Sequence, residues 1–413
     1  MSDRVILHCD CNSFFASVET ALNPKYSGVP MAVCGSERDR HGIVLAKNEL
    51  AKACGVKTAE TVWSAKKKCP NLVVAEPHYE AYADFSRRAN AIYARYTDMI
   101  EQFGIDESWL DVTSSQKLFG SGYEIAECIS RDIKEELGIT VSIGVSFNKV
   151  FAKLGSDYKK PDAITVITRE NMEQIVYPLP VSALLYVGER TAATLMSIGV
   201  RTIGDLARMS PDILTRKLGK SGEMLHKYAC GLDESPVESH ENDDAKSISN
   251  GFTFRHDLVG YDECRVGIAY LSDGIGTKLR ARGLKCCTVQ ITVKDEYLRS
   301  IQRQRQQSPP TDISSEIAET AFKILKDEWS AGKPIRMLTV SATNLIKDES
   351  YAPQLSLFDT DVDSAREKRK KKENAVDKIR QKYGSDSIIK GAIIDTDLGI
   401  YHAPENDIDK YKR

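Results

Sequence analysis

Three acidic residues have the types and positions expected of ligands for hard cations. Asp10 follows the apolar run 5–7, which predicts a short buried strand ending at this aspartate. Open α/β sheets bind their ligands beyond such strand ends. Asp106 and Glu107 are sequence neighbours, which in a regular strand would point to opposite faces. A hairpin turn near Gly104 would interrupt the pleat and let both carboxylates converge with Asp10.

Three convergent carboxylates would suit two Mg²⁺ ions, which prefer oxygen ligands and also bind substrate phosphates. A pair of such ions activates an attacking oxygen and stabilises a leaving one. The alternative is structural, with Asp10 capping a helix and residues 106–107 lying on a solvated turn.

The elements that must position these acids alternate between strand and helix over the first 170 residues. Apolar residues three and four apart predict a long helix over 82–103 and a second over 125–137. Alternation over 139–145 predicts a strand. Residues 23–78 form a long excursion after the first helix, which indicates a small inserted subdomain.

The predicted secondary structure changes twice along the rest of the chain. Residues from about 170 to 240 have short helical patterns, and residues 246–347 combine strand-like runs with one helix, 314–328. The acidic, polar segment 233–246 between them indicates a linker. A polar tail follows residue 347, and we interpret its basic run, 368–372, as solvated linker.

Composition narrows the class of protein. The 413 residues, 41% hydrophobic and 28% charged, are typical of a globular chain of two to four domains. The sequence has no membrane-length apolar run, no signal-peptide pattern and no C-x-x-C among its ten cysteines, which favours a reduced, cytoplasmic location. A net charge of −2 means that any polyanion must be bound by a local patch.

One such patch is predicted between residues 278 and 305, a stretch that contains eight basic residues and only two acidic ones. On alternating strand faces this stretch could follow a phosphate backbone, although a solvated face is the alternative. The basic residues are Lys278, Arg280, Arg282, Lys285, Lys294, Arg299, Arg303 and Arg305.

Three segments in order resemble the motifs of the Y-family (translesion) DNA polymerases. They are His8–Glu19, Gly104–Asp111, and Gly144–Lys153 with the later Lys160-Pro161. The Asp-x-Asn form of the first motif points to the bacterial UmuC-like (ImpB/MucB/SamB) branch rather than the polymerase IV branch.

The resemblance implies an α+β multidomain fold shaped as a right hand, with a ferredoxin-like palm, small fingers, a helix-hairpin-helix thumb and an α/β little finger. The implied boundaries are palm 1–13 and 80–167, fingers 14–79, thumb 168–240, linker 241–245, little finger 246–347, and a flexible tail 348–413.

Site residues follow from the same resemblance. Asp10, Asp106 and Glu107 would be catalytic and hold two Mg²⁺ ions, or Mn²⁺ in their place, together with the Cys11 carbonyl. Phe15 would be the steric gate that excludes a ribose 2′-hydroxyl, with a core aromatic as the alternative. The implied nucleotide-binding residues are Phe14, Phe15, Asn48, Lys52 and Lys160.

The fingers depart from the family pattern at two positions. Glu49 stands where many relatives have tyrosine, and Lys52 where they have arginine. A lysine offers phosphate a point charge but no bidentate fork.

In the thumb, residues 187–195 and 199–206 resemble a helix-hairpin-helix, which binds DNA backbone without reading sequence. Arg190 replaces the usual second glycine, and an ordinary helical hairpin is the alternative. The implied DNA contacts are Gly188, Arg190, Thr191, Lys278, Arg280, Arg282, Arg299 and Arg303.

A short apolar cluster in the polar tail invites a docking function. It resembles the bacterial sliding-clamp peptide, and its contact residues would be Gln354, Leu355, Leu357 and Phe358.

Together these features predict a monomeric template-directed DNA polymerase of low processivity, without a proofreading domain, that uses primer-template DNA and dNTPs and is tethered to the sliding clamp. One alternative is a catalytically idle, clamp-tethered DNA-binding factor, which the loss of an acidic ligand would favour. A nucleotidyl cyclase is another, but it would have no use for the thumb, little finger or clamp peptide.

Overall fold

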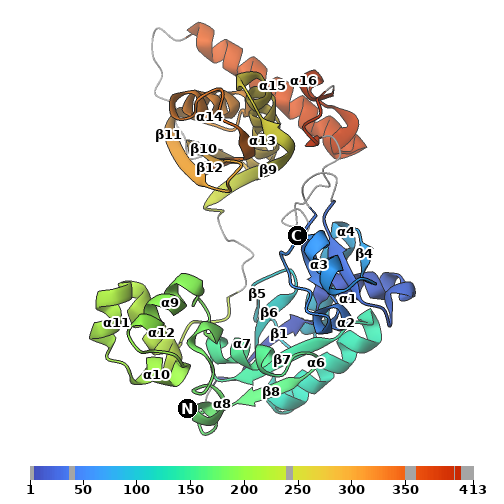
Figure 1. Ribbon diagram of the computed structural model, residues 1–413, viewed down its shortest axis with the longest axis vertical. Coiled ribbons are helices and arrows are strands. Elements are labelled where there is room, and N and C mark those ends of the chain that lie inside the picture. Colours follow the sequence, from blue (N-terminus) through green and yellow to red (C-terminus); the bar gives the residue numbers. More distant parts are fainter. Residues whose placement is uncertain (1–3, 37–41, 239–244, 349–359, 395, 401–413) are drawn as a thin grey trace. The chain divides into compact units, whose positions relative to one another are not determined.

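The computed structural model describes residues 4–36, 42–238, 245–348, 360–394 and 396–400, with the side chains of 360–363 and 386 left aside. The described residues form two compact units (Figure 1). Of the described residues, the first comprises 4–35 and 43–238, and the main part of the second is 245–348, 360–394 and 396–400. Each is described separately below.

A five-stranded sheet forms the palm of the first unit. β1 is its central strand, antiparallel to both β6 and β7, while β7 and β8 run parallel. The strands in spatial order are β5 (Ile100–Gln102), β6 (Glu107–Asp111), β1 (Ile6–Cys11), β7 (Val141–Ser146) and β8 (Ile164–Ile167).

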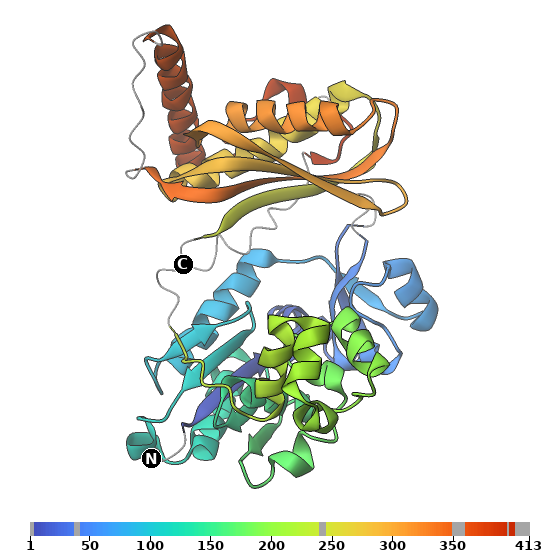
Figure 2. The same cartoon turned by 90° about the vertical axis from the view of Figure 1, so that its left-hand side faces the viewer.

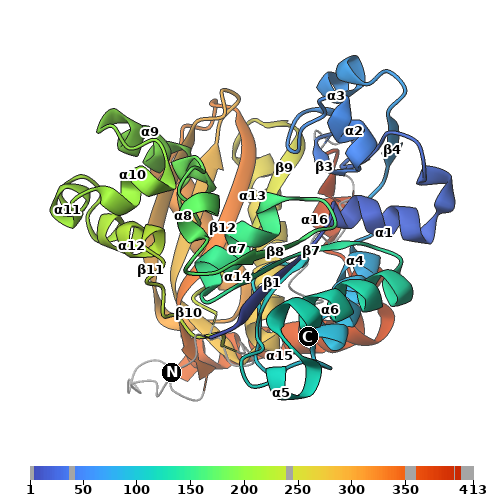
Figure 3. The ribbon, with the colours of Figure 1, turned by 90° about the horizontal axis from the view of Figure 1, so that it is seen from below.

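Helices cover both faces of this sheet, so β1 is buried along its whole length (Figure 3). Leu7 and Cys9 pack into the core beneath α4 (Tyr79–Tyr93) and α6 (Gly122–Leu137). Ile6 points to the other face and packs against Ala152 of α7 (Lys149–Tyr158). Alternation along the strand therefore places Asp10 on the α7 side.

Helix α7 approaches the sheet at backbone distance. A Cβ atom added to Gly144 of β7 would lie 1.8 Å from the carbonyl oxygen of Ala152 and 2.5 Å from the amide nitrogen of Ser156. A Cβ atom added to Gly155 of α7 would lie 3.0 Å from the Gly144 Cα. Only glycine fits at this crossing, because any side chain would overlap main-chain atoms.

Helix α4 is shorter than its apolar pattern predicts. It ends at Tyr93, and residues 100–102 form strand β5. Tyr96 remains buried and its hydroxyl donates to Asp132, whereas Met99 and Phe103 are exposed. The expected helix over 82–103 is therefore correct only for its first half.

The fingers form a small subdomain with its own core. Its sheet has the order β3-β2-β4, with β2 antiparallel to β3 and parallel to β4. The elements are α1 (Phe14–Leu22), a 3-10 turn (Pro24–Tyr26), β2 (Met31–Cys34), β3 (Val44–Lys47), α2 (Glu49–Ala53), α3 (Val62–Lys68) and β4 (Val73–Ala75).

The thumb is all-helical and shares a core with Phe147, Phe151 and Leu154 around α7. The elements of the thumb are α8 (Met172–Ile175), a 3-10 turn (Val181–Ala183), α9 (Glu189–Ser197), α10 (Ile203–Arg208), α11 (Pro211–Leu218) and α12 (Lys220–Ala229). One further short helix, α5 (Gln116–Phe119), belongs to the palm.

The described start of the expected linker, residues 233–238, is bound to the palm. Arg4 donates to the Ser235 carbonyl oxygen at 2.9 Å, and Val237 is buried. The Lys149–Glu101 ion pair (2.5 Å) anchors the same stretch, because Glu101 accepts from the Glu238 amide at 3.0 Å. These residues belong to the folded unit, which corrects their interpretation as linker.

The second unit is a four-stranded antiparallel sheet in the order β11-β10-β12-β9, with α13 and α14 on one face (Figure 2). The 21-residue helix α13 was not expected from the sequence. The elements are β9 (Ser247–Leu258), α13 (Tyr261–Ala281), β10 (Leu284–Lys294), β11 (Ser300–Thr311), α14 (Ser314–Glu328) and β12 (Ile335–Lys347).

Helix α15 (Thr360–Tyr383), followed by a 3-10 turn (Ser385–Ser387) and α16 (Gly391–Ile394), also belongs to this unit. It packs with charged rather than apolar side chains. Its inward residues, spaced alternately four and three apart, are Arg366, Lys370, Glu373, Asp377 and Arg380.

Each inward residue of α15 has a partner in the little finger. Arg280, whose side chain is 6% exposed, pairs with Glu373 at 2.5 Å and Asp377 at 2.6 Å. Glu373 also accepts from the Ser314 amide in the first turn of α14. The remaining pairs are Arg366–Glu316, Lys370–Asp312, Lys370–Asp348 and Arg380–Asp273. The prediction of a flexible tail from 348 onward is therefore wrong for the described part of this segment.

None of the described helices combines the length and apolar composition that a membrane span requires.

Candidate active site

Two of the three predicted acids face each other across neighbouring strands. Asp10 at the end of β1 is in register with Glu107, the first residue of β6. Strands β5 and β6 form the expected hairpin, because the amides of Phe103 and Gly104 both donate to the Glu107 carbonyl oxygen. Asp106 precedes β6, and its carbonyl oxygen accepts from the Cys11 amide at 3.0 Å.

Lysine side chains from α7 and the loop after it contact these acids. Lys160 Nζ lies 2.6 Å from Asp10 Oδ2 and 2.7 Å from Asp157 Oδ1. Lys153 pairs with Glu107. His8 lies beneath this pair, fully buried, with Nε2 3.2 Å from Glu107 Oε2 but not aligned for a hydrogen bond.

The ring of His8 is oriented from its other side. Its Nδ1 lies 2.8 Å from the Ser156 hydroxyl, which itself donates to the Lys153 carbonyl oxygen. The hydroxyl oxygen therefore accepts from Nδ1–H, and Nε2 faces Glu107.

The protonation preferences of the acids differ because their surroundings differ. Burial, reinforced by the charges of Asp10 and Glu107, raises the pKa of Asp106 to about 6. Burial likewise raises the pKa of Asp10, although the Lys160 ammonium opposes the rise. Burial would raise the pKa of Glu107, but His8 and Lys153 outweigh burial and lower it to about 2.

The chemistry of this donor set fits hard divalent cations. Carboxylate oxygens are preferred ligands of Mg²⁺. Burial and, after it, the like charges of Asp10 and Glu107 raise the pKa of Asp106, and a bound cation would offset both effects. Among the described side chains, however, no three His, Cys, Asp or Glu are grouped as a metal site. The oxygens of Asp10 and Glu107 instead face the ammonium groups of Lys160 and Lys153.

Phe15, the predicted steric gate, packs against two tyrosine rings. The half-buried ring of Phe15 lies parallel to Tyr82 at 4.1 Å between centroids and meets Tyr79 edge-on at 6.2 Å. The Tyr82 hydroxyl donates to Glu19 at 2.5 Å, and His78 Nδ1 lies 2.9 Å from the same carboxylate.

Two other residues predicted to contact the nucleotide, Phe14 and Asn48, have structural roles. Phe14 is 3% exposed, so its side chain belongs to the core. Asn48 caps α2: its Oδ1 accepts from the Ala51 and Met31 amides, and its Nδ2 donates to the Val29 carbonyl oxygen. This use of the amide argues against the predicted nucleotide contact.

Lys52 is exposed on α2 and pairs with Glu49 at 3.3 Å. Glu49 also accepts from the Ser13 hydroxyl, which ties the start of α2 to the residue before α1. Of the two positions that depart from the family pattern, Glu49 thus contacts the start of the helix that carries Phe15.

The predicted helix-hairpin-helix residues lie at the start of α9. Gly188 is the N-cap, Arg190 is exposed, and Thr191 is half-buried in the first turn. Gly199, with a φ of 87°, connects this helix toward α10.

The basic patch predicted for the little finger is not arranged as expected. Lys278 and Arg280 lie on helix α13, and Arg282 caps its end, instead of lying on strand faces. Arg280 is buried in its ion pairs with α15. Arg303 on edge strand β11 turns toward α14, where it pairs with Glu328 at 2.9 Å.

Two further basic residues of that patch are also paired within the little finger. Arg305 pairs with Asp327 of α14 and Lys285 with Asp348. Arg299 precedes β11, and its amide donates to Asp295 in the β10–β11 turn. Four of the eight predicted cations, Arg280, Lys285, Arg303 and Arg305, therefore pair with acids of the same unit.

The sheet face away from α13 and α14 is polar but carries little charge. Because Val289, Ile291 and Val293 are buried in the helix-covered core, the alternate residues of β10 face the other way. Hydroxyl and amide groups dominate that face and can donate hydrogen bonds to phosphate. They include Gln290, Thr292, Gln302, Gln304, Thr339 and Ser341.

Sequence reasoning did not single out four residues that contact the site: His8, Lys153, Glu19 and Tyr82. The first three fall inside the quoted motif segments, so their positions were the available signal.

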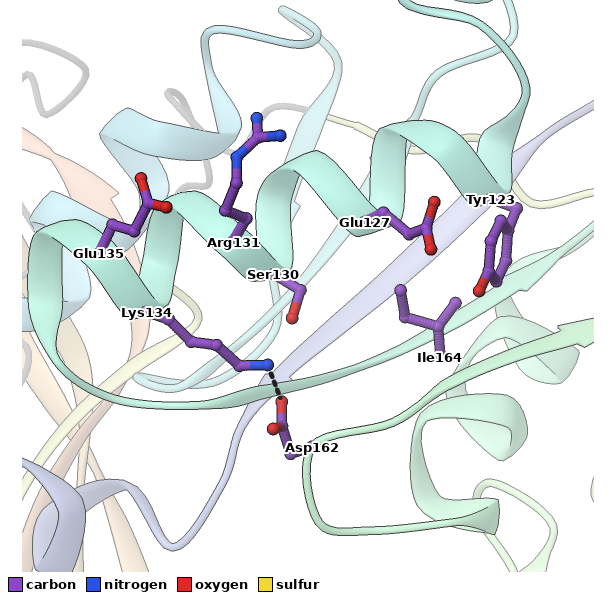
Figure 4. Close-up of a pocket in the computed structure, with 8 residues that line it drawn as sticks. All are labelled: Tyr123, Glu127, Ser130, Arg131, Lys134, Glu135, Asp162 and Ile164. Carbon is purple, nitrogen blue, oxygen red and sulfur yellow. Dashed lines mark ion pairs between the residues drawn. The ribbon is translucent and has the colours of Figure 1, made fainter.

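A shallow depression of about 600 Å³ lies beside α6 (Figure 4). Lys134 of α6 reaches across it to Asp162 at 2.8 Å. Its lining contains none of the three predicted acids. The predicted clamp-binding residues, 354–358, lie outside the described residues.

Comparisons with known proteins cover nearly the whole chain. Residues 9–157 match the impB/mucB/samB family, residues 245–357 match the C-terminal domain of that family, and residues 184–233 match the thumb domain of DNA polymerase-iota. A protein named DNA polymerase IV from Acetivibrio thermocellus is 48% identical over 95% of this chain and 98% of its own length. One of that name from Clostridium kluyveri is 39% identical over 95% and 98%.

A solved Y-family DNA polymerase chimera (Dbh-Dpo4-Dbh) aligns with a TM-score of 0.74 and 25% identity, covering 83% of this chain and 99% of the chimera. Because the relatives carry the name DNA polymerase IV, the Asp-x-Asn motif does not set this chain apart from proteins of that name. The expected right-hand fold and enzyme class are confirmed. The chain belongs to the impB/mucB/samB family and is a Y-family, DNA-directed DNA polymerase.

Proposed function

We propose that this polymerase extends primers across damaged templates by two-metal nucleotidyl transfer, with Mg²⁺ held by Asp10, Asp106, Glu107 and the Cys11 carbonyl. The observation that carries the proposal is the register of Asp10 with Glu107 beside the turn that bears Asp106. When bound, the ions would activate the primer 3′-hydroxyl and stabilise the leaving oxygen.

The lysines would have their own roles in this reaction. Burial would lower the pKa of Lys160, but Asp10 outweighs burial and raises it, so the side chain stays an ammonium. A half-buried cation beside Asp10 supports the proposal that Lys160 binds the triphosphate. Lys52, as an exposed point charge, would assist from the fingers.

Selection of the nucleotide sugar and attachment to the sliding clamp would depend on separate parts of the chain. Phe15, backed by Tyr82, would exclude the ribose 2′-hydroxyl. The peptide 354–358 would dock on the sliding clamp, and the enzyme would act as a cytoplasmic monomer of low processivity without proofreading.

Single-nucleotide addition by Asp106→Asn and Glu107→Gln tests the chemistry. Each variant should lose incorporation while keeping primer-template affinity within a few-fold. Asp98→Asn, which neutralises an exposed carboxylate of the same palm, is the matched control and should extend normally. Extension that survives in either variant would remove that residue from the ligand set.

A further inference from the structure

The two sides of helix α15 differ in charge. Its inward stripe mixes acidic and basic residues, and each has an ion-pair partner in the little finger. Of its exposed charged side chains among the described ones, six are basic and only Glu367 is acidic; it pairs with Lys371 at 2.7 Å on the helix surface. The six are Lys368, Arg369, Lys371, Lys372, Lys378 and Lys382.

Four of these lysines form one stripe. At about 100° per residue, Lys368, Lys371, Lys378 and Lys382 lie opposite the inward stripe, with Ala375 filling the remaining position. The stripe is about 21 Å long at 1.5 Å per residue. It can therefore span several phosphates, because duplex DNA carries about one charge per 1.7 Å of axis.

We propose that this outward stripe of α15 is a second, sequence-independent contact with the backbone of duplex DNA. The proposal rests on the enzyme being a DNA polymerase, whose substrate is a polyanion. It differs from the basic patch expected at 278–305, where four of the eight cations pair with acids of the same unit.

Three physical points favour DNA over an acidic protein surface. The cations repeat along a straight helix, as phosphates repeat along a duplex. All four charges of the stripe are lysines, whose ammonium groups act as point charges on flexible side chains and can follow a phosphate backbone without reading sequence. The helix is already fixed to the folded unit by buried ion pairs, so presenting the charges costs little ordering.

Salt dependence of DNA binding by the full-length enzyme tests the proposal. Lys378→Gln with Lys382→Gln removes two cations of the stripe. Lys323→Gln with Lys326→Gln, on the exposed side of α14, is the control with the same charge change in the same unit. Fluorescence anisotropy gives Kd for two unrelated primer-template duplexes across a salt series.

Each lost phosphate contact lowers the slope of log K against log salt by about 1. The α15 double variant should therefore bind more weakly to both duplexes, with a slope smaller by about 2, while the α14 double variant keeps the parental slope. Equal slopes in parent and α15 variant, or equal losses in both variants, would overturn the proposal. Nucleotide addition by the parent reports separately on the active site, so failure of either proposal can be recognised.

Discussion

The rings of Phe15 and Tyr82 are stacked, with an interplanar angle of 11° and a centroid separation of 4.1 Å. The stack is held from behind, because the Tyr82 hydroxyl donates to the buried carboxylate of Glu19. A ring fixed on its rear face can exclude an atom that approaches its front.

Phe15→Ala should therefore raise ribonucleotide incorporation relative to deoxyribonucleotide incorporation. A clash of one or two atoms is worth about 1–3 kcal/mol, or about 10- to 200-fold in discrimination. The ratio of kcat/KM for the two nucleotides measures the change. Tyr82→Phe keeps the stacked ring and should discriminate like the parent. If Phe15→Ala also discriminates like the parent, Phe15 is only a core residue.

The raised pKa of Asp106 predicts a pH dependence of stability when divalent cations are removed. A carboxyl whose pKa is about 6 in the folded state and 3.8 ordinarily binds its proton more tightly when folded. Its contribution therefore favours folding at low pH and is lost as pH rises from about 4 to 6. Thermal unfolding in EDTA should show Asp106→Asn gaining stability over the parent at pH 7 but not at pH 4. A constant difference across this range would contradict the assignment.

Removing Arg280 should release α15 from the little finger. Arg280→Ala leaves Glu373 and Asp377 without their shared cation, and breaking a buried pair in this way costs about 3–5 kcal/mol. Trypsin cleavage within 366–382 should then accelerate by about a hundredfold, because about 3 kcal/mol corresponds to that change in the open population. Arg303→Ala, which removes an exposed pair in the same unit, is the control and should leave the cleavage rate nearly unchanged. Parental protection of α15 in Arg280→Ala would show that the helix is held by other contacts.

The tail peptide is tested by replacing Leu357 and Phe358 with alanine. Burying two such side chains could supply roughly 3–6 kcal/mol before ordering costs, which predicts a contact in the micromolar range. The variant should extend primers normally without a clamp and lose stimulation by a loaded clamp. Stimulation equal to that of the parent would exclude this peptide as the tether.

The central architecture of the palm could be predicted because its signals are local. The apolar run before Asp10, the alternation before Ser146 and the stripe of α6 each follow from one element's periodicity. The turn at Gly104 was predictable for a chemical reason, since adjacent acids converge only where the pleat is broken.

Helix α13 was not predicted, although Ile268, Leu271, Ile275 and Leu279 form an apolar stripe, and α15 was not predicted over its full length. Helix α13 contains Gly267, Gly274 and Gly276, which lower helix propensity. All three sit where a Cβ would meet another element: Gly267 against Phe254, Gly274 against Asn250 and Gly276 against Ser314. Helix α15 buries charges, so its stripe becomes visible only with the partners known.

The ion pairs of Asp10 and Glu107 could not be predicted either. Lys153 and Lys160 are 46 and 150 residues from Glu107 and Asp10, their respective partners. No local pattern links positions that far apart. The apolar stripe after Tyr93 led to a helix prediction that is too long, because residues such as Tyr96 stay in the core after the helix has ended.

The close crossing of β7 and α7 has a consequence for how this enzyme tolerates mutation. Gly144 has no functional group, yet any larger residue there would push α7 away from the sheet. That shift would carry Lys149 and Lys153 off Glu101 and Glu107 together. In a saturation screen for polymerase function, Gly144 should be as intolerant of substitution as the acids themselves, although it takes no part in the chemistry.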